Sequence, residues 1–386
     1  LVAARATTKS VPEICQVLSQ SHGYLVLTRQ LGLTRQDHSG RYFVELVQIS
    51  DSELKQLASG IDRYPIEQTE VWGTYNQKLG RKVWGRFALK SGKKTKAVIV
   101  LTEYSVRGFK YLWAKNGPVW FKSPSPADEA ELRELLLVEV KKRDKKVIFV
   151  RLHATYEAED THRVLQYLPY DKTVLVDLSS GTAQGIVDAL PTEGRRAIRR
   201  VNKRIEGRDD VQFREVTGLS EQEFAKYYKI MQITAQRDGF RPHPMKVYTD
   251  MLSILGPEHA RLFAVFIDDK PVCWDLVVVN GKHSWAYYGA SLPEAHDVLG
   301  ADLLDLRTCQ TLAAEGVKTF DLMGTDSSRC PELYGVGQYK KRWAHHRTEL
   351  PWAWDVPVNK PVYLALKHAL ASKRVLSGAL QKIAKK

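Results

Sequence analysis

The residues best suited to chemistry lie near the end of the chain, between Phe320 and His346. The stretch FDLMG ends a predicted strand at a glycine, a small polar loop follows, and cations then surround two aromatic residues in YKKRW, residues 339–343. Cations fixed beside a reacting group stabilise negative charge that develops on it. Taken alone, however, these lysines are more simply explained as the coat of a surface loop.

Two further stretches carry aromatic and polar side chains at predicted strand and helix ends. In WAYYGAS, the alternation of a strand predicts that Trp285 and Tyr287 share one face and that Tyr288 lies on the other. In RDGFRPHPMKVY, glycine and prolines form a predicted loop that begins at Arg237 and Asp238. Such loops position ligand-binding groups, although these two residues also fit an ion pair at a helix end.

Several familiar catalytic patterns are missing from the sequence. It contains no nucleophile elbow, Walker loop, HExxH motif or dinucleotide fingerprint. Its four cysteines lack CxxC spacing, and the adjacent pair His345-His346 lacks metal-ligand spacing. We therefore predict neither a metal nor a cofactor, and a reducing cytoplasm as the setting.

Length and charge suggest the kind of molecule and partner. The chain has 386 residues, which favours two domains, and lysine plus arginine exceed aspartate plus glutamate by 58 − 44 = 14. A surplus of this size is typical of proteins with a polyanionic partner, although a solvated basic surface would also explain it. No apolar run approaches ~18–20 residues and no signal pattern opens the chain, so a cytoplasmic protein is expected.

Hydrophobic periodicity predicts one order of elements twice. The order is helix, three strands, helix and strand, at 66–80, 83–89, 96–104, 110–120, 125–143 and 145–154, and again at 244–255, 260–269, 271–279, 282–291, 300–316 and 317–324. The strand after each long helix would insert beside the three-strand meander. This predicts an α/β protein with mixed sheets, built from two copies of one unit.

A strongly basic helix is predicted between the two copies. Residues 195–208 carry seven lysines and arginines against one acid, with apolar residues along one stripe. A solvated helix face is one explanation. The other is a track for RNA phosphates, for which the candidates are Arg196, Arg199, Arg200, Lys203 and Arg204.

The end of the chain is basic as well. Residues 361–386 contain no acid, and their apolar residues recur at helical spacing. Basic amphipathic helices lie on anionic membrane surfaces, so weak association with the inner membrane leaflet is one expectation. Packing of the apolar face on the protein is the alternative.

Six stretches in order resemble one family. EQTEVWGTYNQKLG, RRAIRRVNKRI, AQRDGFRPHPMKVY, YYGAS, KTFDLMGT and LYGVGQYKKRW resemble the Fem family of bacterial peptidyltransferases, over about residues 43 to 365. The resemblance implies two tandem acetyltransferase-like (GNAT) domains. We place them at 43–178, completed by 347–386, and at 179–346, after an extension of residues 1–42. The helical arm of FemA-like members is absent, so the chain is closer to compact FemX-like members.

The resemblance also implies a reaction and a site. An amino acid would pass from aminoacyl-tRNA to an amine on a peptidoglycan precursor, either lipid II or UDP-MurNAc-pentapeptide. The implied catalytic residues are Lys340 and Tyr288, with Lys341 and Arg342 on tRNA phosphates. The implied substrate-binding residues are Trp72, Gln68, Arg237, Asp238, Arg241, His243, Tyr248 and Tyr287.

Three positions depart from the family pattern. His153 stands where an aspartate is often found, and Thr74 where a lysine is common. His243 precedes a proline where an arginine is expected, although Arg241 before Pro242 could replace it after a short shift. These departures affect the precursor contacts. An acyl-CoA-dependent N-acyltransferase is the main alternative and a non-catalytic RNA-binding protein is the second.

Overall fold

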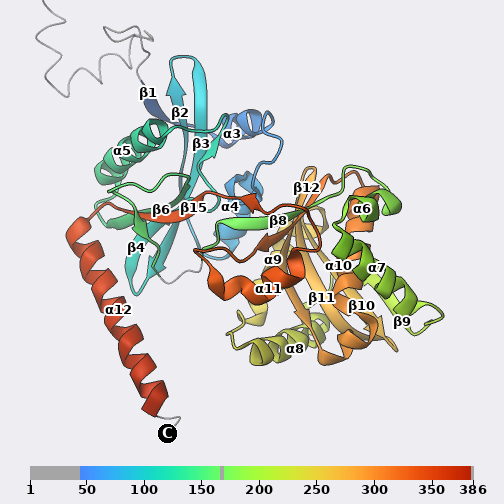
Figure 1. Ribbon diagram of the computed structural model, residues 1–386. Coiled ribbons are helices and arrows are strands. Elements are labelled where there is room, and N and C mark those ends of the chain that lie inside the picture. Colours follow the sequence, from blue (N-terminus) through green and yellow to red (C-terminus); the bar gives the residue numbers. More distant parts are fainter. Residues whose placement is uncertain (1–43, 166–168, 384–386) are drawn as a thin grey trace, which may run out of the picture.

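The protein folds into two lobes, each built on one mixed sheet (Figure 1). The structure, a computed structural model, describes residues 44–165 and 169–383, with the helical backbone alone from residue 373. The predicted extension of residues 1–42 lies outside the described residues. The predicted α/β class with mixed sheets is confirmed.

The first sheet has eight strands in the order β1-β2-β3-β4-β6-β15-β7, with β5 paired to β3. Their bounds are β1 Val44–Gln48, β2 Val83–Ser91, β3 Lys94–Val106, β4 Phe109–Trp113, β5 Val119–Trp120, β6 Val147–Ala154, β7 His162–Arg163 and β15 Trp352–Pro357. One strand was predicted over 110–120. It is divided into β4 and β5 by a turn that contains the cis peptide bond Gly117–Pro118.

The second sheet has seven strands in the order β14-β8-β13-β12-β11-β10-β9. Their bounds are β8 Lys172–Asp177, β9 Val211–Glu215, β10 Ala260–Ile267, β11 Lys270–Asn280, β12 His283–Ser291, β13 Thr319–Gly324 and β14 Thr348–Glu349. β12 and β13 pair in parallel, and the other described neighbours are antiparallel.

Helices cover both sheets, and three of them begin with a capping box. Ser50, Ser125 and Ser220 each accept a backbone N–H from the third helical residue, whose carboxylate accepts from the serine N–H in return. The helices are α3 Asp51–Ala58, η1 Ile66–Gln68, α4 Glu70–Lys78, α5 Pro126–Arg143, α6 Ala183–Ala189, α7 Thr192–Ile205, α8 Glu221–Asp238, α9 Met245–His259, η2 Pro293–Val298, α10 Gly300–Ala314, η3 Pro331–Leu333, α11 Tyr334–Lys340 and α12 Lys360–Ile383.

The predicted repeat is confirmed. The order α4-β2-β3-β4-α5-β6 recurs as α9-β10-β11-β12-α10-β13. In each copy the strand after the long helix pairs in parallel with the third strand of the meander, as β4 with β6 and β12 with β13. The lobes also exchange strands, because β8 follows the first unit but pairs with β13, and β15 follows the second unit but pairs with β6.

The predicted domain limits can be compared with this strand exchange, and they remain a prediction. The limits at 178/179 and 346/347 put β8 and β14 with the first domain, whereas both strands pair in the second sheet. β15 and α12 pack with the first sheet, on the predicted side of the limit.

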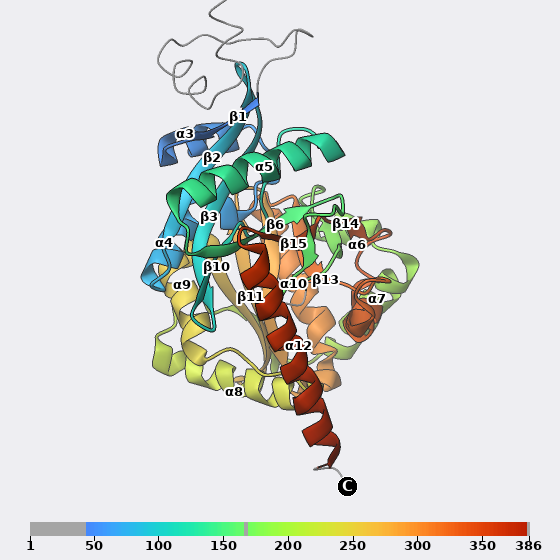
Figure 2. The same cartoon turned by 90° about the vertical axis from the view of Figure 1, so that its left-hand side faces the viewer.

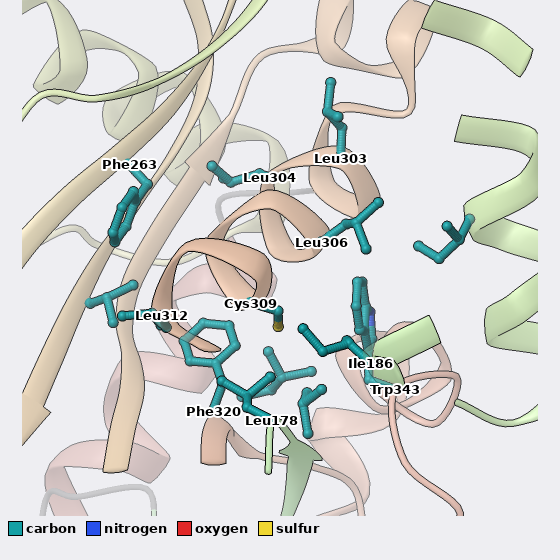
Figure 3. Packing of buried hydrophobic residues seen from close by; sticks show 14 of the residues in the cluster. Leu178, Ile186, Phe263, Leu303, Leu304, Leu306, Cys309, Leu312, Phe320 and Trp343 are labelled. Carbon is teal, nitrogen blue, oxygen red and sulfur yellow. The ribbon is translucent and has the colours of Figure 1, made fainter. Parts of the chain in front are cut away.

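The two faces of the second sheet bury different cores. On one face, which we call the α10 face, Cys309, Phe320 and Trp343 pack with α6, α7 and α10 (Figure 3). On the other, the α9 face, Trp274 and Tyr227 pack with α8 and α9. Helix α4 of the first lobe joins this second core and so fixes the two lobes together.

Helix α12 leaves the first lobe at the end of the chain (Figures 1 and 2). Its first turns bury Tyr363, Leu366 and Leu370 in a cluster with Phe149 of β6, so packing accounts for the beginning of the predicted amphipathic stripe. The side chains from residue 373 on lie outside the described residues. Within 44–165 and 169–383, no helix is long and apolar enough to cross a membrane.

Candidate functional site

Lys340 is the last residue of α11, and its ammonium is held by the end of β13. Its Nζ donates to the carbonyl oxygen of Gly324 at 2.7 Å and lies 3.4 Å from that of Met323. Met323 adopts a left-handed φ of 64°, and its N–H donates to the Asp321 carboxylate at 2.7 Å. Asp321 therefore helps to bend the strand end so that two carbonyls face the ammonium.

Burial lowers the pKa of Lys340 to about 8, and the charges of Asp321, Asp305 and Asp275 limit the fall. The side chain thus remains mainly an ammonium at neutral pH. Its pKa is close enough to neutrality for it to lose the proton in moderately alkaline solution.

The lysine lies where two parallel strands diverge. β12 and β13 pair only from His283 with Thr319 to Trp285 with Asp321. Beyond that point β12 continues to Ser291 beside β11, and β13 turns away at Gly324. We call this place, where the two strands no longer pair, the open gap, and Lys340 is bound to its β13 side.

A pair of carboxyl groups lies near Lys340 on the α10 face. Asp275 of β11 and Asp305 of α10 interact, and the Tyr339 hydroxyl donates to Asp305 at 2.5 Å. Burial raises the pKa of both acids, that of Asp305 to about 6. A Cβ at Gly289, which faces Asp275 across β11 and β12, would collide with that carboxylate.

The first lobe reaches the same region through Arg63. Its guanidinium forms an ion pair with Asp321 and lies 5.9 Å from the centre of the Trp285 ring. Burial raises the pKa of Asp321, and Arg63 and the Thr173 hydroxyl oppose that rise. Arg63 therefore supports the same carboxylate that shapes the carbonyl cradle of Lys340.

A second group of polar residues lies on the α9 face, where the lobes meet. Lys115 Nζ donates to the Tyr287 hydroxyl at 2.7 Å and lies 3.6 Å from Glu67, and the same hydroxyl donates to Glu67. The ammonium also lies 5.1 Å from the centre of the Trp72 ring. We call these four residues the Lys115 cluster. Burial lowers the pKa of Lys115, which Glu67 opposes, and raises the pKa of Tyr287.

His153 adds an unpaired nitrogen near this cluster. Its Nδ1 lies 3.1 Å from the carbonyl oxygen of Pro351, while its Nε2 is buried without a hydrogen-bond partner among the described residues. Burial lowers the pKa of His153 to about 4, so the imidazole is neutral. Glu67 and Lys115 both act on its charge, which places His153 within electrostatic reach of the cluster.

The structure brings several predicted site residues together beside the Lys115 cluster. Tyr288 lies 4.8 Å from Tyr248 and 5.8 Å from His243 between ring centres. Tyr287 lies 5.7 Å from Trp72. Trp285 and Tyr287 share one face as predicted, but Tyr288 was placed on the wrong face, because a bulge opposite Leu276 and Val277 turns it toward the same α9-face core.

Other predicted substrate residues are engaged in structural contacts. The Gln68 amide is fully buried and bonds the backbone of Val100 and Lys115. Arg237 forms an ion pair with Asp238 at the end of α8 and donates to the Ser291 carbonyl at 3.1 Å, as the helix-end alternative predicted. Arg241 is exposed on the loop that follows, and Tyr248 is buried.

The predicted phosphate-binding cations fall into two classes. Five side chains project from the exposed side of α7, namely Arg196, Arg199, Arg200, Lys203 and Arg204. Lys341 is exposed and lies 3.8 Å from Glu193. Arg342, in contrast, pairs with Asp302 at 3.0 Å and packs over the Tyr339 ring, so this residue has a structural partner already.

Among the site residues that sequence reasoning missed are Arg63, Glu67, Lys115, Tyr170, Asp275, Asp305 and Asp321. Glu67 could have been found from the sequence, because it is the first residue of one of the stretches that resemble the family. Tyr170 packs against Gly324, where a Cβ would collide with its ring, and it also affects the charge of Tyr287. It therefore lies beside the strand end that forms the Lys340 cradle.

The described part of the chain contains no candidate metal-binding site. No group of three or more histidine, cysteine, aspartate or glutamate side chains in residues 44–165 and 169–383 is placed to hold a metal ion. The three cysteines in this part are buried and unpaired, and burial raises the pKa of each thiol.

Comparisons with known proteins agree with the fold. The acetyltransferase (GNAT) domain profile matches residues 192–341, which span α7 to α11. The crystal structure of FemX superposes with a TM-score of 0.65 over 83% of this chain and 99% of that one, at 15% sequence identity. The two lobes are thus tandem GNAT-like domains.

Two curated relatives match in sequence, and both are named lipid II:glycine glycyltransferase. The Staphylococcus saprophyticus protein is 22% identical over 37% of this chain and 50% of its own length. The Staphylococcus haemolyticus protein is 28% identical over 29% of this chain and 26% of its own length. The matched segments thus span half or less of these relatives.

Proposed function

We propose that this chain, a member of the Fem family, transfers an amino acid from aminoacyl-tRNA to an amino group on the stem peptide of a peptidoglycan precursor. The observation that carries the proposal is the half-buried Lys340, whose ammonium is held by strand-end carbonyls at the gap between β12 and β13. The relatives' names supply the class of acceptor.

The chemistry of an activated ester explains why a fixed cation suffices. When an amine attacks the ester carbonyl of an aminoacyl-tRNA, negative charge develops on the carbonyl oxygen and then on the leaving ribose oxygen. One preorganised donor at such an oxygen contributes about 3–4 kcal/mol of transition-state stabilisation. Lys340 is the donor that we assign to this role, and positioning of the two substrates supplies much of the rest.

Proton balance assigns a role to the Lys115 cluster. An acceptor ammonium that becomes an amide loses two protons, of which the leaving ribose hydroxyl takes one, so one proton must leave the site. Lys115 has a lowered pKa, and its hydrogen bond to Tyr287 leads on to Glu67. We assign this connected group to the acceptor side, as the path for the released proton.

We assign the two substrates to opposite faces of the second sheet. Lys340, Asp305 and helix α7 belong to the α10 face, which we assign to the tRNA donor. The Lys115 cluster with Tyr288 and His243 belongs to the α9 face, which we assign to the acceptor peptide. The two substrates would meet at the gap, where Tyr170 packs against Gly324.

An acyl-CoA-dependent N-acyltransferase is the second candidate, and the GNAT domain match is the observation that favours it. Enzymes of that type bind a pyrophosphate at the helix N-terminus after the gap strand. Here that helix is α10, which carries Asp302 in its first turn and follows Asp297. Asp302 is already paired with Arg342, whereas the exposed Asp297 opposes a pyrophosphate at this end, so charged tRNA is the better donor.

The location that we expect for the enzyme depends on whether its acceptor is lipid-linked. If the acceptor is lipid II, we expect a cytoplasmic enzyme that associates weakly with the inner membrane leaflet, since anionic surfaces attract each nearby cation by about 1 kcal/mol. The acid-free end of the chain would provide those cations. Co-sedimentation of the full chain with anionic vesicles, compared with a chain that ends near Asn359, measures this contribution.

Transfer of a labelled amino acid tests the main proposal. A panel of charged tRNAs is offered with lipid II or UDP-MurNAc-pentapeptide, and acetyl-CoA replaces the tRNA in a parallel reaction. We expect labelled peptide from at least one charged tRNA and none from acetyl-CoA. Transfer from acetyl-CoA alone would overturn the proposal in favour of the second candidate.

A further inference from the structure

A basic cavity that the mechanism above does not use lies beside the C-terminal end of α11. It has a volume of about 400 Å³. Its lining residues are Lys172, Val174, Lys341, Ala344, His345, His346 and Arg347. We call it the basic pocket. Among its seven lining residues, three are lysine or arginine, two are histidine and none is acidic.

The fold places this pocket on the side of the sheet that carries Lys340. Val174 packs in the α10-face core, and Lys172 is two residues away on the same side of β8. Thr173 points to the opposite side, where it contacts Asp321. The buried Trp343 anchors the loop after α11, so the far wall of the pocket is fixed.

Helix α7 begins next to the pocket. A Cβ at Gly194 would collide with the carbonyl oxygen of Arg342, which shows how closely the helix and the loop pack. Glu193 at the start of α7 lies 3.8 Å from Lys341 in the pocket wall. From there to Arg204 the helix extends about 16 Å, since each residue adds ~1.5 Å. The exposed cations of α7 therefore lead away from the pocket along one line.

The cations of the pocket are only loosely neutralised. Lys172 lies 3.4 Å from Glu349, whose side chain is 83% exposed, and the partner of Lys341 is 60% exposed. Such exposed ion pairs contribute little, so an incoming anion can replace them. Arg347 has a closer partner, Asp326 at 2.8 Å.

We propose that the basic pocket binds backbone phosphates in the single-stranded 3′ end of the donor RNA, next to the ester that Lys340 acts on. This inference rests on the proposed function. Lys341, which lines the pocket, directly follows Lys340 in the chain. The phosphodiester is the ligand chemistry that a cavity of three permanent cations and two imidazoles recognises.

Exposed His346 provides a test that should leave the fold intact, because its one ring contact within the described chain is with His345, at 6.4 Å. His346→Glu places a carboxylate in the pocket, and His346→Gln is the neutral control. Lys172→Gln removes one cation. Lys141→Gln with Lys142→Gln removes two exposed cations from α5 in the first lobe and controls for total charge.

The binding experiment uses one RNA stem-loop with and without a single-stranded 3′ tail, and thermal melting confirms that each variant is folded. We expect the wild-type chain to bind the tailed RNA roughly tenfold more tightly, the effect of one charged hydrogen bond. His346→Glu and Lys172→Gln should reduce that ratio, whereas His346→Gln should preserve most of it and the α5 control all of it. An unchanged ratio in both pocket variants overturns the proposal.

Transfer kinetics separate this inference from the proposed function. In the pocket variants we expect KM for charged tRNA to rise, with KM for the acceptor unchanged. If the wild-type chain transfers from charged tRNA and the variants keep its KM, the pocket assignment alone fails. If the wild-type chain uses no charged tRNA, the proposed function fails and the inference with it. Displacement of the tailed RNA by coenzyme A but not by excess untailed RNA would assign the pocket to a pyrophosphate instead.

Discussion

The two copies of the repeated unit differ most where their parallel strands part. In the first copy, two backbone hydrogen bonds connect β4 and β6 beyond their pairing. The Ala114 N–H donates to the Arg151 carbonyl oxygen and the His153 N–H donates to the Gly117 carbonyl oxygen, each at 2.8 Å. The buried Gln68 amide binds the same turn through the Lys115 carbonyl. In the second copy, β12 and β13 stop pairing at Trp285 and Asp321, and the open gap holds Lys340.

The difference indicates how one fold provides both a scaffold and a site. These hydrogen bonds hold β4, β6 and the turn after β4 together in the first copy, and we call this place the closed gap. The open gap keeps a buried ammonium and a carboxyl pair whose pKa values are shifted by burial. Perturbed groups at a strand opening are typical of functional sites. The first copy still contributes to the site, because Lys115, in the turn after β4, donates a hydrogen bond to Tyr287 of the second lobe.

The largest expected effect is at the open gap. Lys340→Met removes the cation and should lower turnover on the order of 10²–10³-fold, the effect of losing one oxyanion donor. The folded state should persist, because the substitution removes a buried charge rather than a core side chain. Single-turnover transfer measures the decrease, and circular dichroism checks the fold. Wild-type turnover in a folded variant would remove Lys340 from the mechanism.

The protonation state of Lys340 makes a second prediction. With a pKa of about 8, the ammonium is present below that value and is lost as the pH rises through it. Lys340→Arg keeps its charge over this range. We therefore expect the rate of the wild-type chain, divided by that of the arginine variant, to fall above about pH 8. A ratio that stays level from pH 7 to pH 9 would contradict an ammonium role.

The comparison also explains how much the sequence could predict. Periodicity, caps and glycine stops identified both copies of the repeat, because these signals are local, whereas Lys340 was singled out through the family resemblance. The carbonyl cradle depends on a left-handed Met323, a conformation that no local pattern indicates for a methionine. The bulge at Tyr287 likewise depends on pairing with β11, so the alternation rule failed there.

Contacts between the lobes could not be predicted at all. Arg63 reaches Asp321, 258 positions away in the chain, and Lys115 reaches Tyr287 over 172 positions. Lysine and arginine are common in loops, so nothing in the sequence marks Arg63 or Lys115 as special. Only the folded structure shows that they contact the other lobe. The strand exchange of β8 and β15 is of the same kind, since strand partners far apart in sequence leave no local signal.

At the closed gap we expect a decrease in stability. Gln68→Ala leaves the Val100 N–H and the Lys115 carbonyl buried without their partner, and each unsatisfied group costs about 1–3 kcal/mol. Urea unfolding measures the change, and Gln77→Ala on the exposed side of α4 serves as the control. A stability close to the wild type, combined with a large rise in acceptor KM, would restore Gln68 as a substrate residue.

Lys115 links the two copies, and its substitution should have a smaller effect. Lys115→Met removes the ammonium from between Glu67 and Tyr287 but keeps the apolar stem over Trp72. We expect about a tenfold fall in kcat, since one charged hydrogen bond is removed, with KM for charged tRNA unchanged. Because Lys115 faces Glu67, Tyr287, Arg81, His153 and His243, the pH dependence of kcat should change as well.

Thr74→Ala, on the exposed side of α4, is a matched control near the same cluster, because its hydroxyl donates to the Glu70 carbonyl of its own helix. Equal kinetics and an unchanged pH profile in Lys115→Met would show that the cluster only joins the lobes. A change in KM for tRNA would instead contradict the assignment of this face to the acceptor.

The smallest expected effect per residue is on α7, where the charges are exposed. Neutralising Arg196, Arg200 and Arg204 together should flatten the salt dependence of tRNA binding, by roughly 0.7–0.9 in slope for each phosphate that the helix no longer neutralises. Lys141, Lys142 and Lys145 of the first lobe provide an equal reduction of charge as the control. Acceptor binding should not change in either variant. If both triple variants alter the salt slope equally, α7 is a solvated face, and the division of donor and acceptor between the two faces has no support on the α10 side.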